Sequence, residues 1–438
     1  MSTIQQPSIR PGRRAVIVGG VRTPFVKAFK EFLKMDTIAL GDAAVGALLK
    51  QTELPRRELD SIVWGGVILP GLAPNVAREI ALDLRLPASV EGFTVTRACA
   101  TGLQAVTCAA AAIERGDADV VIAGGSDSTS NAEIKLPQKV VHAMAPLAFG
   151  KATPADMLGV LSQLVPISEI LPKMPKIAER TTGQVMGEAA EEMATRNGIS
   201  RAAQDEFAVR SHHRAAAAIA SGRFSDEVAP VQTPKGKWVH GDTIVRADTS
   251  VEALGKLRPV FAKNGTLTAG NSSALTDGAA AVLLMSEEKA KALGYTGLAY
   301  FKSWSYVGVD PADQLLMGPA LAMPKALDRA GLSLGDIDVI DMHEAFAAQV
   351  LSVLKMLGSD AFARARLGRD KAVGVVDPDK LNLHGGSVAL GHPFGATGAR
   401  MVTTVANELH RSGKQHALLG ICAAGGLGAG AVLERCAN

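Results

Sequence analysis

The sequence has few cysteines and little net charge, and each shortage excludes a class of protein. Four cysteines among 438 residues are too few for a disulfide-linked scaffold, and none forms a CxxC pair. A reducing compartment is therefore expected. The 46 basic residues exceed the 43 acidic residues by only three, and an excess of this size does not indicate a nucleic-acid-binding protein.

The sequence also lacks a segment typical of a membrane or secreted protein. The longest uncharged stretch, 415–433, approaches the length of a transmembrane helix, but it contains His416 and five glycines, which favour a strand, a turn and a second strand. Residues 1–14 hold prolines and arginines and no apolar core of a signal peptide. We expect a cytoplasmic protein with no transmembrane segment; the mitochondrial matrix is the alternative location.

Several ligand-binding motifs are missing as well. No GxGxxG follows the first apolar segment and no GxxxxGK[ST] occurs, so neither a dinucleotide-binding fold nor a P-loop is supported. The histidines and cysteines do not have the spacing of zinc fingers or of HExxH, and no aspartate cluster accompanies them. We therefore expect no metal and no permanently bound cofactor.

Short apolar segments alternate with helical patterns, which predicts a layered α/β fold with helices packed on a sheet. Hydrophobic residues make up 47% of the chain, enough to exclude disorder, and the length suggests about two to three domains. Helices are expected near 42–50 and 100–113. Strands are expected near 14–19, 60–65, 93–96 and 119–125.

Part of the pattern occurs twice, which favours a duplication. Ala100-Thr101-Gly102 is matched by Ala396-Thr397-Gly398, and each is followed by an apolar strand that ends in a glycine pair. Residues 128–250 fit neither repeat and form either an inserted lid or a solvated surface excursion. The predicted domains are an N-terminal half (14–127 with 251–292), the insertion (128–250) and a C-terminal half (293–438).

Cys99 is the first candidate for a reactive residue. It follows a predicted strand and immediately precedes a helix, so unpaired backbone N–H groups and the positive end of the helix dipole should favour its thiolate and lower its pKa. The same N–H groups could stabilise an oxyanion on an attacked carbonyl. The alternative is a buried cysteine that acts as a small hydrophobic residue.

Three further residues stand at the ends of predicted elements in the second half. His392 precedes Pro393 in a loop before a helix, at the place equivalent to Cys99, and a nearby helix N-terminus disfavours imidazolium, which suits a general base. Cys422 and His343 follow apolar strands at carboxyl ends, where the sites of α/β proteins are usually assembled. Each of the three, taken alone, could instead be structural.

These residues stand in segments that resemble the thiolase family, the acetyl-CoA acyltransferases, across nearly the full length. Several blocks occur in the family's order, which makes the resemblance specific. The matching blocks are Arg97-Ala-Cys-Ala-Thr-Gly-Leu-Gln-Ala, Met186-Gly, Ser200-Arg-Ala-Ala-Gln-Asp-Glu-Phe-Ala, Ser211-His, Lys256-Leu-Arg-Pro, Thr268-Ala-Gly-Asn-Ser-Ser-Ala-Leu-Thr-Asp-Gly-Ala-Ala, His343-Glu-Ala-Phe-Ala, Gly391-His-Pro-Phe-Gly-Ala-Thr-Gly and Cys422-Ala-Ala-Gly-Gly.

The resemblance implies a five-layered α-β-α-β-α sandwich of two duplicated halves, with the insertion as a loop domain that covers CoA. It also implies cleavage of 3-oxoacyl-CoA by ping-pong Claisen chemistry in fatty-acid β-oxidation. Cys99 would be the nucleophile, His392 its base and Cys422 the acid that protonates the departing carbanion. The backbone N–H groups of Cys99 and Ala424 would form an oxyanion hole, and His392 with His343 would support the enolate oxygen.

Further implications of the resemblance concern ligands and partners. CoA would be a co-substrate, and Met186, Arg246 and Ser273 would line its path. A homodimer or homotetramer is expected. Many thiolases have asparagine where His343 stands and glycine where Ala424 stands, and both departures are similar to the β-subunits of fatty-acid-oxidation multienzyme complexes. Those subunits pair with a hydratase/dehydrogenase α-subunit, which would be a possible partner here. The family's usual histidine before Met186 is Val185, which leaves a specificity for acetoacetyl-CoA open.

Three other functions remain as alternatives. A ketosynthase-like condensing enzyme of the same fold pairs a cysteine with two histidines, so His343 and His392 do not decide against it, whereas Cys422 favours a thiolase. A biosynthetic acetoacetyl-CoA thiolase runs through the same intermediates in reverse. A non-catalytic lipid carrier is disfavoured because Cys99, His392 and Cys422 are all present.

Overall fold

The computed structural model describes residues 12–134, 136–149, 153, 159 and 178–437. The chain divides into two compact units, one of residues 1–131 and 178–438 and a smaller one of residues 132–177. Helix α4 (Gln138–Phe149) belongs to the smaller unit. The predicted insertion of 128–250 includes residues outside the described part of the chain (150–152, 154–158 and 160–177), and its boundaries stay a prediction.

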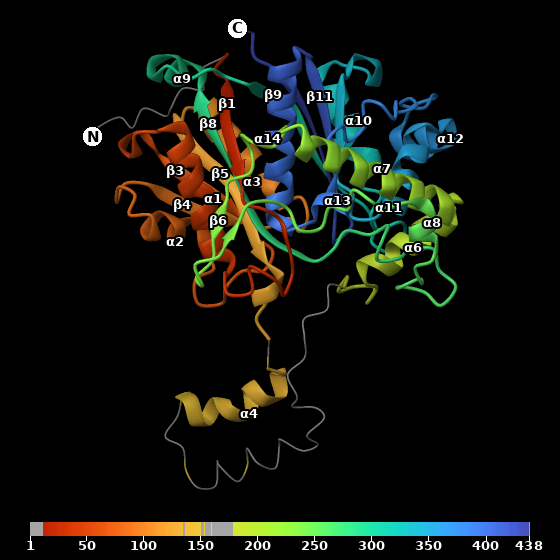
Figure 1. Cartoon of the computed structure of the whole chain (residues 1–438), viewed down its shortest axis with the longest axis horizontal. Helices are drawn as coiled ribbons and strands as arrows, with labels where there is room; N and C mark the ends of the chain where they lie inside the picture. The colour runs from red at the N-terminus through yellow and green to blue at the C-terminus, as the bar shows by residue number, and fades with distance from the viewer. Residues whose placement is uncertain (1–11, 135, 150–152, 154–158, 160–177, 438) are drawn as a thin grey trace, which may run out of the picture. The chain divides into compact units, whose positions relative to one another are not determined.

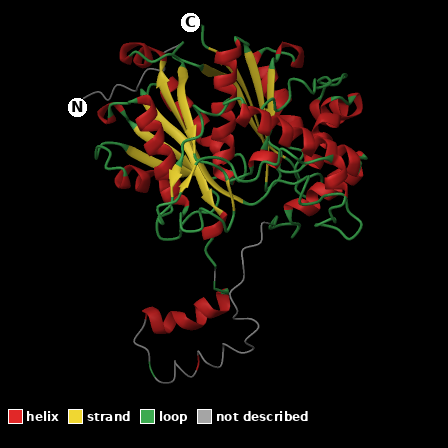
Figure 2. Ribbon diagram, viewed as in Figure 1, coloured by secondary structure: helices red, strands yellow, loops and turns green. Residues whose placement is uncertain are grey.

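The strands of the larger unit follow the same order twice (Figure 2). In the N-terminal half the order is β1 (Ala15–Arg22), β8 (Thr276–Ser286), β5 (Val120–Ser128), β3 (Ser61–Gly65) and β4 (Glu91–Val95). In the C-terminal half it is β9 (Ala299–Gly308), β12 (Leu427–Arg435), β11 (His416–Ala423) and β10 (Val339–Met342). The pairs β5–β3 and β11–β10 are parallel, and β8 and β12 are antiparallel to both neighbours. This repetition confirms the predicted duplication.

A short pairing connects the two sets of strands. Val16 and Ile17 of β1 lie opposite Tyr300 and Ala299 of β9, so the hydrogen-bonded path runs through nine strands; the short β2 (Val26–Lys27) pairs with β8 beside this path and is the tenth strand of the sheet. The two sets are therefore joined into one sheet where their first strands, β1 and β9, pair.

Three hydrophobic clusters show how the layers are stacked (Figure 1). The central cluster contains α3 (Thr101–Arg115), α14 (Phe394–Ser412) and the inner faces of both strand sets. A second covers the outer face of the N-terminal set with α1 (Thr37–Thr52) and α2 (Val76–Asp83). A third covers the outer face of the C-terminal set with α10 (Pro319–Ala330) and α11 (Ala347–Leu357). The predicted α-β-α-β-α order is therefore confirmed.

Glycines let the two central helices touch through their backbones. A Cβ on Gly102 of α3 would collide with the carbonyl oxygen of Gly395, and one on Gly398 of α14 would collide with the backbone nitrogen of Leu103. Only glycine fits at such distances. The repeated Ala-Thr-Gly motif therefore marks the place where the two halves meet. Because both glycines lie in the first turns, the N-termini of α3 and α14, and with them Cys99 and His392, come together.

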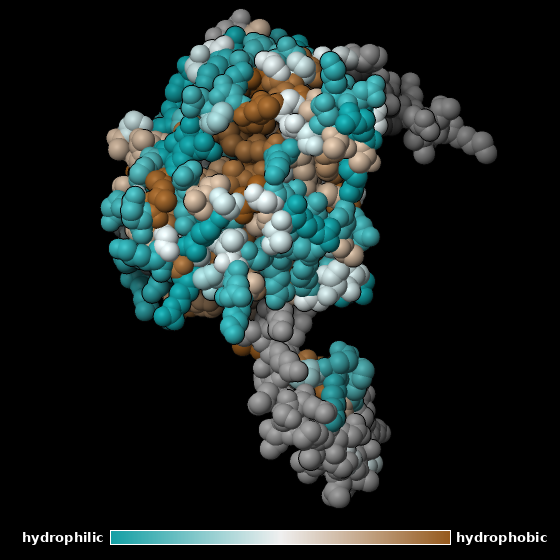
Figure 3. All heavy atoms as spheres, turned by 90° about the vertical axis from the view of Figure 1, so that its right-hand side faces the viewer, coloured by the Kyte–Doolittle hydropathy of each residue, from teal (hydrophilic) through white to brown (hydrophobic). Residues whose placement is uncertain are grey.

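The remaining elements surround this sandwich. They are α6 (Met186–Asn197), α7 (Arg201–Ala220), α8 (Val251–Gly255), α9 (Glu287–Leu293), α12 (Asp360–Phe362), α13 (Ser387–Leu390) and the hairpin of β6 (Val231–Gln232) with β7 (Trp238–Val239). On the face shown in Figure 3, hydrophilic residues (teal) form most of the surface, and hydrophobic residues (brown) gather mainly near its upper middle. Over the described residues, every helix is too short or too polar to cross a bilayer.

Candidate active site

Cys99 lies in a tight turn between β4 and α3. Thr101 closes this turn: its Oγ1 accepts the N–H of Arg97 at 2.6 Å and its hydroxyl donates to the carbonyl oxygen of Ala98 at 2.6 Å. Ala98 has a φ of 45°, in the left-handed region that a residue with a Cβ rarely adopts. Such a conformation costs about 1–3 kcal/mol and persists only where its surroundings impose it. The turn therefore holds the thiol of Cys99 in a fixed direction.

His392 is held from both sides by threonine hydroxyls. Its backbone N–H donates to Oγ1 of Thr276 at 3.0 Å, and its Nδ1 lies 2.6 Å from Oγ1 of Thr397, in the first turn of α14. Thr397 is the counterpart of Thr101 in the repeated motif. The same threonine position thus orients the candidate nucleophile in one half and the candidate base in the other.

His343 follows β10 and is fully buried. Its backbone N–H donates to the carbonyl oxygen of Gly420 at 2.8 Å, and its Nδ1 lies 2.9 Å from the hydroxyl of Ser387 at the start of α13. The ring centroids of His343 and His392 are 4.1 Å apart. Over the described residues, Nε2 of each ring has no hydrogen-bond partner. Both Nε2 atoms are therefore available to a substrate.

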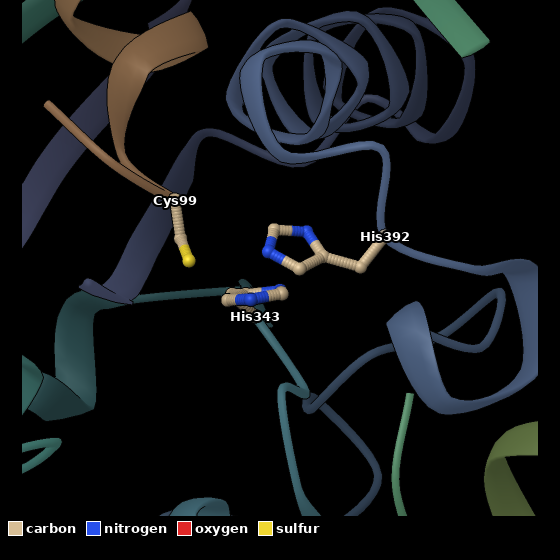
Figure 4. A group of neighbouring side chains, drawn as sticks. All are labelled: Cys99, His343 and His392. Carbon is tan, nitrogen blue, oxygen red and sulfur yellow. The ribbon is translucent and has the colours of Figure 1, made fainter. Parts of the chain in front are cut away.

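The three side chains converge on one point. One ligand atom from each of Cys99, His343 and His392 lies within 4.8 Å of the other two. In Figure 4 the sulfur of Cys99 points toward the space between the two imidazole rings. Cys99 remains partly exposed, whereas the histidines are buried. A reactant that reaches the sulfur therefore also meets both rings.

Cys422 and Ala424 complete the site from the C-terminal end of β11. Cys422 is buried near the end of β11, opposite Gly428 of β12, and close enough to Cys99 that a charge on one thiol affects the other. The backbone N–H of Ala424 donates a hydrogen bond to the sulfur of Cys99. The next two residues, Gly425 and Gly426, have φ of 82° and 64° and form the tight turn that directs this N–H inward.

The expected lowering of the Cys99 pKa is wrong. Burial raises the pKa of this thiol to about 11, and the backbone hydrogen bond from Ala424 only partly offsets it. The nearby carboxylate of Asp127 raises it further. The free-energy cost of removing a thiolate from water is larger than the stabilisation that the backbone N–H groups at the start of α3 provide. The raised pKa of Cys99, the candidate nucleophile, therefore favours a neutral thiol at rest.

Both imidazoles are neutral at physiological pH. Burial, followed by the positive charge of Arg400, lowers the pKa of His392 to about 3. Burial, then His392 and Arg400, lowers the pKa of His343 well below its usual value. The expected direction for His392 is confirmed, although the leading cause is burial rather than the helix N-terminus. A neutral imidazole beside a neutral thiol can accept the thiol proton when the sulfur attacks.

Alkylation of Cys99 by iodoacetamide should therefore rise with pH. Since only the thiolate reacts and the pKa is raised, the thiolate fraction at pH 7 is small and the rate should increase about tenfold per pH unit up to about pH 10. Peptide mass spectrometry of Cys99 over pH 6–10 measures this directly. A rate that is already constant below pH 7 would mean a thiolate–imidazolium pair and contradict the neutral pair. The partly exposed Cys436 provides an internal comparison.

Two buried acidic residues, which the sequence did not single out as functional, support the histidines. Glu344 accepts hydrogen bonds from Ser211 at 2.7 Å and from Asn382 at 2.6 Å, and so fixes the backbone next to His343. Asp341, on β10, pairs with Arg400 of α14 at 2.8 Å, with both side chains almost fully buried. The sequence around His343 offered no signal for these partners, since Ser211, Asn382 and Arg400 come from other segments.

The three residues expected on the CoA path lie in different parts of the structure. Ser273 is close to the site, because its N–H donates to the carbonyl oxygen of Ala345, two residues after His343. Met186, at the start of α6, packs against the outer hydrophobic cluster of the C-terminal half. Arg246 is exposed, and its backbone N–H donates to Nδ1 of the buried His212 at 3.2 Å. Contacts of these residues with CoA stay a prediction.

Comparisons with known proteins agree with this geometry. The family model of the thiolase N-terminal domain matches residues 15–288, and that of the thiolase C-terminal domain matches residues 295–435. The chain belongs to the thiolase family. A 3-ketoacyl-CoA thiolase of Pseudoalteromonas translucida is 46% identical, with 97% of each chain covered.

Solved structures of thiolases have the same fold. The acetyl-CoA acetyltransferase of Bacillus anthracis superposes with a TM-score of 0.81 at 33% identity, covering 97% of this chain and 99% of its own. The human mitochondrial 3-ketoacyl-CoA thiolase in complex with CoA superposes with a TM-score of 0.80 at 30% identity, covering 97% and 98%. The predicted thiolase fold is confirmed.

Proposed function

We propose that this thiolase cleaves 3-oxoacyl-CoA with CoA to acetyl-CoA and an acyl-CoA shortened by two carbons. The observation that carries the proposal is the convergence of the Cys99 thiol on two neutral imidazoles, with a second buried thiol at Cys422. Claisen cleavage needs a nucleophile, a base and an acid that protonates carbon, and these side chains supply all three. The 3-ketoacyl-CoA thiolase name of the relative described above supports it.

In the first half of the reaction, the sulfur of Cys99 attacks the 3-keto carbon while its proton moves to Nε2 of His392. The new oxyanion accepts hydrogen bonds from the backbone N–H groups of Cys99 and Ala424. Collapse breaks the bond between C2 and C3 and leaves the enolate of acetyl-CoA, whose oxygen lies between His392 and His343. The thiol of Cys422 then protonates C2, and acetyl-CoA leaves.

In the second half, CoA attacks the thioester on Cys99. The proton held by His392 has by then passed to the thiolate of Cys422, so the neutral His392 takes the thiol proton of CoA and gives it to the departing sulfur of Cys99. The free enzyme is regenerated with every proton accounted for. CoA is therefore a co-substrate, and we propose Ser273, Met186 and Arg246 as residues along its path.

The competing functions are separated by Cys422. A decarboxylating condensing enzyme needs no protein acid to protonate carbon, whereas this site has a thiol whose pKa is raised well above its usual value by burial, so that it stays protonated. The synthetic direction, condensation of two acetyl-CoA molecules, uses the same groups, and a reversible reaction runs both ways on one site. We assign the degradative direction because the relative at 46% identity bears that name.

We also propose a homo-oligomer in the cytoplasm, with a hydratase/dehydrogenase subunit as a further partner. Support for self-association comes from β4, which pairs with β3 and otherwise forms the open edge of the strand order in the described chain, with Phe93 exposed on it. An unpaired edge strand is a ready template for a second copy. The cytoplasmic location rests on the bacterial source of the relative.

The purified protein should cleave 3-oxoacyl-CoA esters only when CoA is present. Acetyl-CoA formation is measured by chromatography over a series of esters from four carbons upward. A rate that increases with chain length supports the degradative proposal, and a rate confined to acetoacetyl-CoA contradicts it in favour of a short-chain enzyme. No cleavage of any ester by the folded protein would overturn the proposed function.

A further inference from the structure

The cluster of Cys99, His343 and His392 has the composition of a metal site as well as of a catalytic site. One thiol sulfur and two imidazole nitrogens, each from a different segment, lie within 4.8 Å of one another. Thiolate and imidazole are the ligands that Zn²⁺ and Cd²⁺ prefer, and three protein ligands with one open position are typical of accessible zinc sites. The spacing of these residues along the sequence, 99, 343 and 392, hides this arrangement.

We infer that the active site binds one thiophilic divalent cation, such as Zn²⁺ or Cd²⁺, through Cys99, His343 and His392, and that the bound ion inhibits the enzyme reversibly. The cation is an inhibitor and not a resident cofactor, since it occupies the nucleophile and the base. Binding replaces the S–H proton of Cys99 with a metal–sulfur bond, and the proton passes to the buffer. A water molecule completes the four ligands.

The histidines are prepared for this role. Each Nδ1 is engaged by a hydroxyl, His343 by Ser387 at 2.9 Å and His392 by Thr397 at 2.6 Å, while each Nε2 has no hydrogen-bond partner over the described residues. Hydrogen bonds of this kind fix the ring orientation of metal-binding histidines.

The geometry requires only a small contraction. In a tetrahedral site with Zn–S of about 2.3 Å and Zn–N of about 2.0–2.1 Å, the ligand atoms are roughly 3.3–3.6 Å apart. The three atoms here need to approach by about 1.5 Å at most. Cys99 is the partly exposed member of the cluster.

The buried charges around the cluster do not oppose the ion strongly. Arg400 is the nearby cation, and it is paired with Asp341, whose second carboxylate oxygen has no hydrogen-bond partner in the described part of the chain. Asp127 adds a buried carboxyl close enough to affect Cys99. The charges of Arg400 and Asp341 cancel, and the thiolate of Cys99 lowers the charge of a bound divalent cation from +2 to +1.

The test measures binding without turnover. Zinc chloride is titrated into the full-length protein by calorimetry, and labelling of Cys99 by iodoacetamide is followed by mass spectrometry with and without Zn²⁺ and then with EDTA. We expect one Zn²⁺ per chain, release of one proton, protection of Cys99 and recovery after EDTA. Binding that leaves Cys99 fully reactive, or no binding at micromolar Zn²⁺, would overturn the inference.

Variants identify the ligands. Cys99→Ala and His343→Asn should each lose the one-to-one binding, and Ser387→Ala, which removes only the hydroxyl behind His343, should weaken it about 10- to 100-fold. Cys108→Ala and Cys436→Ala are matched controls that should bind Zn²⁺ as the natural protein does. Unchanged binding in Cys99→Ala or His343→Asn would refute the site. Since none of these measurements uses 3-oxoacyl-CoA, failure of the proposed function would not affect them.

Discussion

Replacing Cys99 by alanine should abolish the acyl-enzyme and lower turnover by at least about 10⁴-fold. The change removes one sulfur atom and leaves the turn intact, because Thr101 holds the turn through backbone atoms of Arg97 and Ala98. The effect is then chemical rather than structural. Steady-state cleavage of a 3-oxoacyl-CoA and the intact mass of the protein after incubation with the ester measure it directly.

The control is Cys108→Ala, on the helix α3 that follows Cys99. Cys108 accepts a weak hydrogen bond from Gln104 at 3.1 Å and packs against the central hydrophobic cluster, so its loss affects packing alone. Both variants should unfold within a few degrees of the natural protein, and Cys108→Ala should keep its acyl-enzyme. Turnover within tenfold of normal in Cys99→Ala, or an acyl group found on Cys422 instead, would remove Cys99 as the nucleophile.

Features of the fold and the site that depend on residues close together in the sequence could be predicted from it. The alternation of strands and helices, the repeated Ala-Thr-Gly and the position of Cys99 before a helix are all local patterns. They were sufficient for the layered fold, for the duplication and for two reactive residues facing each other. The glycines of the repeat add the reason: without them α3 and α14 could not approach through their backbones.

The electrostatics could not be predicted in this way. A helix N-terminus suggests a lowered thiol pKa at Cys99, but burial raises this pKa, and residues far away in the sequence also act on it: Asp127 raises it and the backbone N–H of Ala424 lowers it. Desolvation depends on the whole packing and here outweighs the local dipole. The same holds for the ion pair of Arg400 with Asp341, which joins a helix with a strand 59 residues away.

The hydroxyls that orient the histidines could be predicted only in part. Thr397 is visible in the sequence, since it repeats Thr101, and its bond to His392 could have been inferred from the duplication. Ser387 begins a helix of four residues and Thr276 begins a long strand. Thr276 stands within one of the blocks that resemble thiolases, but neither position signals a contact with a histidine. Only the folded chain shows that they contact His343 and His392.

Replacing Cys422 by serine should separate the two halves of the chemistry. Serine keeps the shape of the side chain, but its hydroxyl is a far weaker acid than a thiol, so proton transfer to and from carbon should fall by about 10³-fold or more. Attack on a thioester by Cys99 needs His392 and the backbone N–H of Ala424, not the thiol of Cys422. Transfer of an acyl group to Cys99 should therefore stay within about tenfold of normal.

Two measurements on the same variant distinguish these steps. Exchange of the methyl protons of acetyl-CoA in deuterated water, followed by NMR, reports on Cys422, and exchange of labelled CoA into acetyl-CoA reports on Cys99 and His392. Removal of a methyl proton needs the thiolate of Cys422, and burial raises the pKa of this thiol well above its usual value, so the first exchange should rise about tenfold per pH unit between pH 6 and 8 in the natural protein. If the methyl protons still exchange in Cys422→Ser, another group transfers the proton. If both exchanges disappear together, Cys422 also shapes the acylation site, and the division of roles between the two cysteines is wrong.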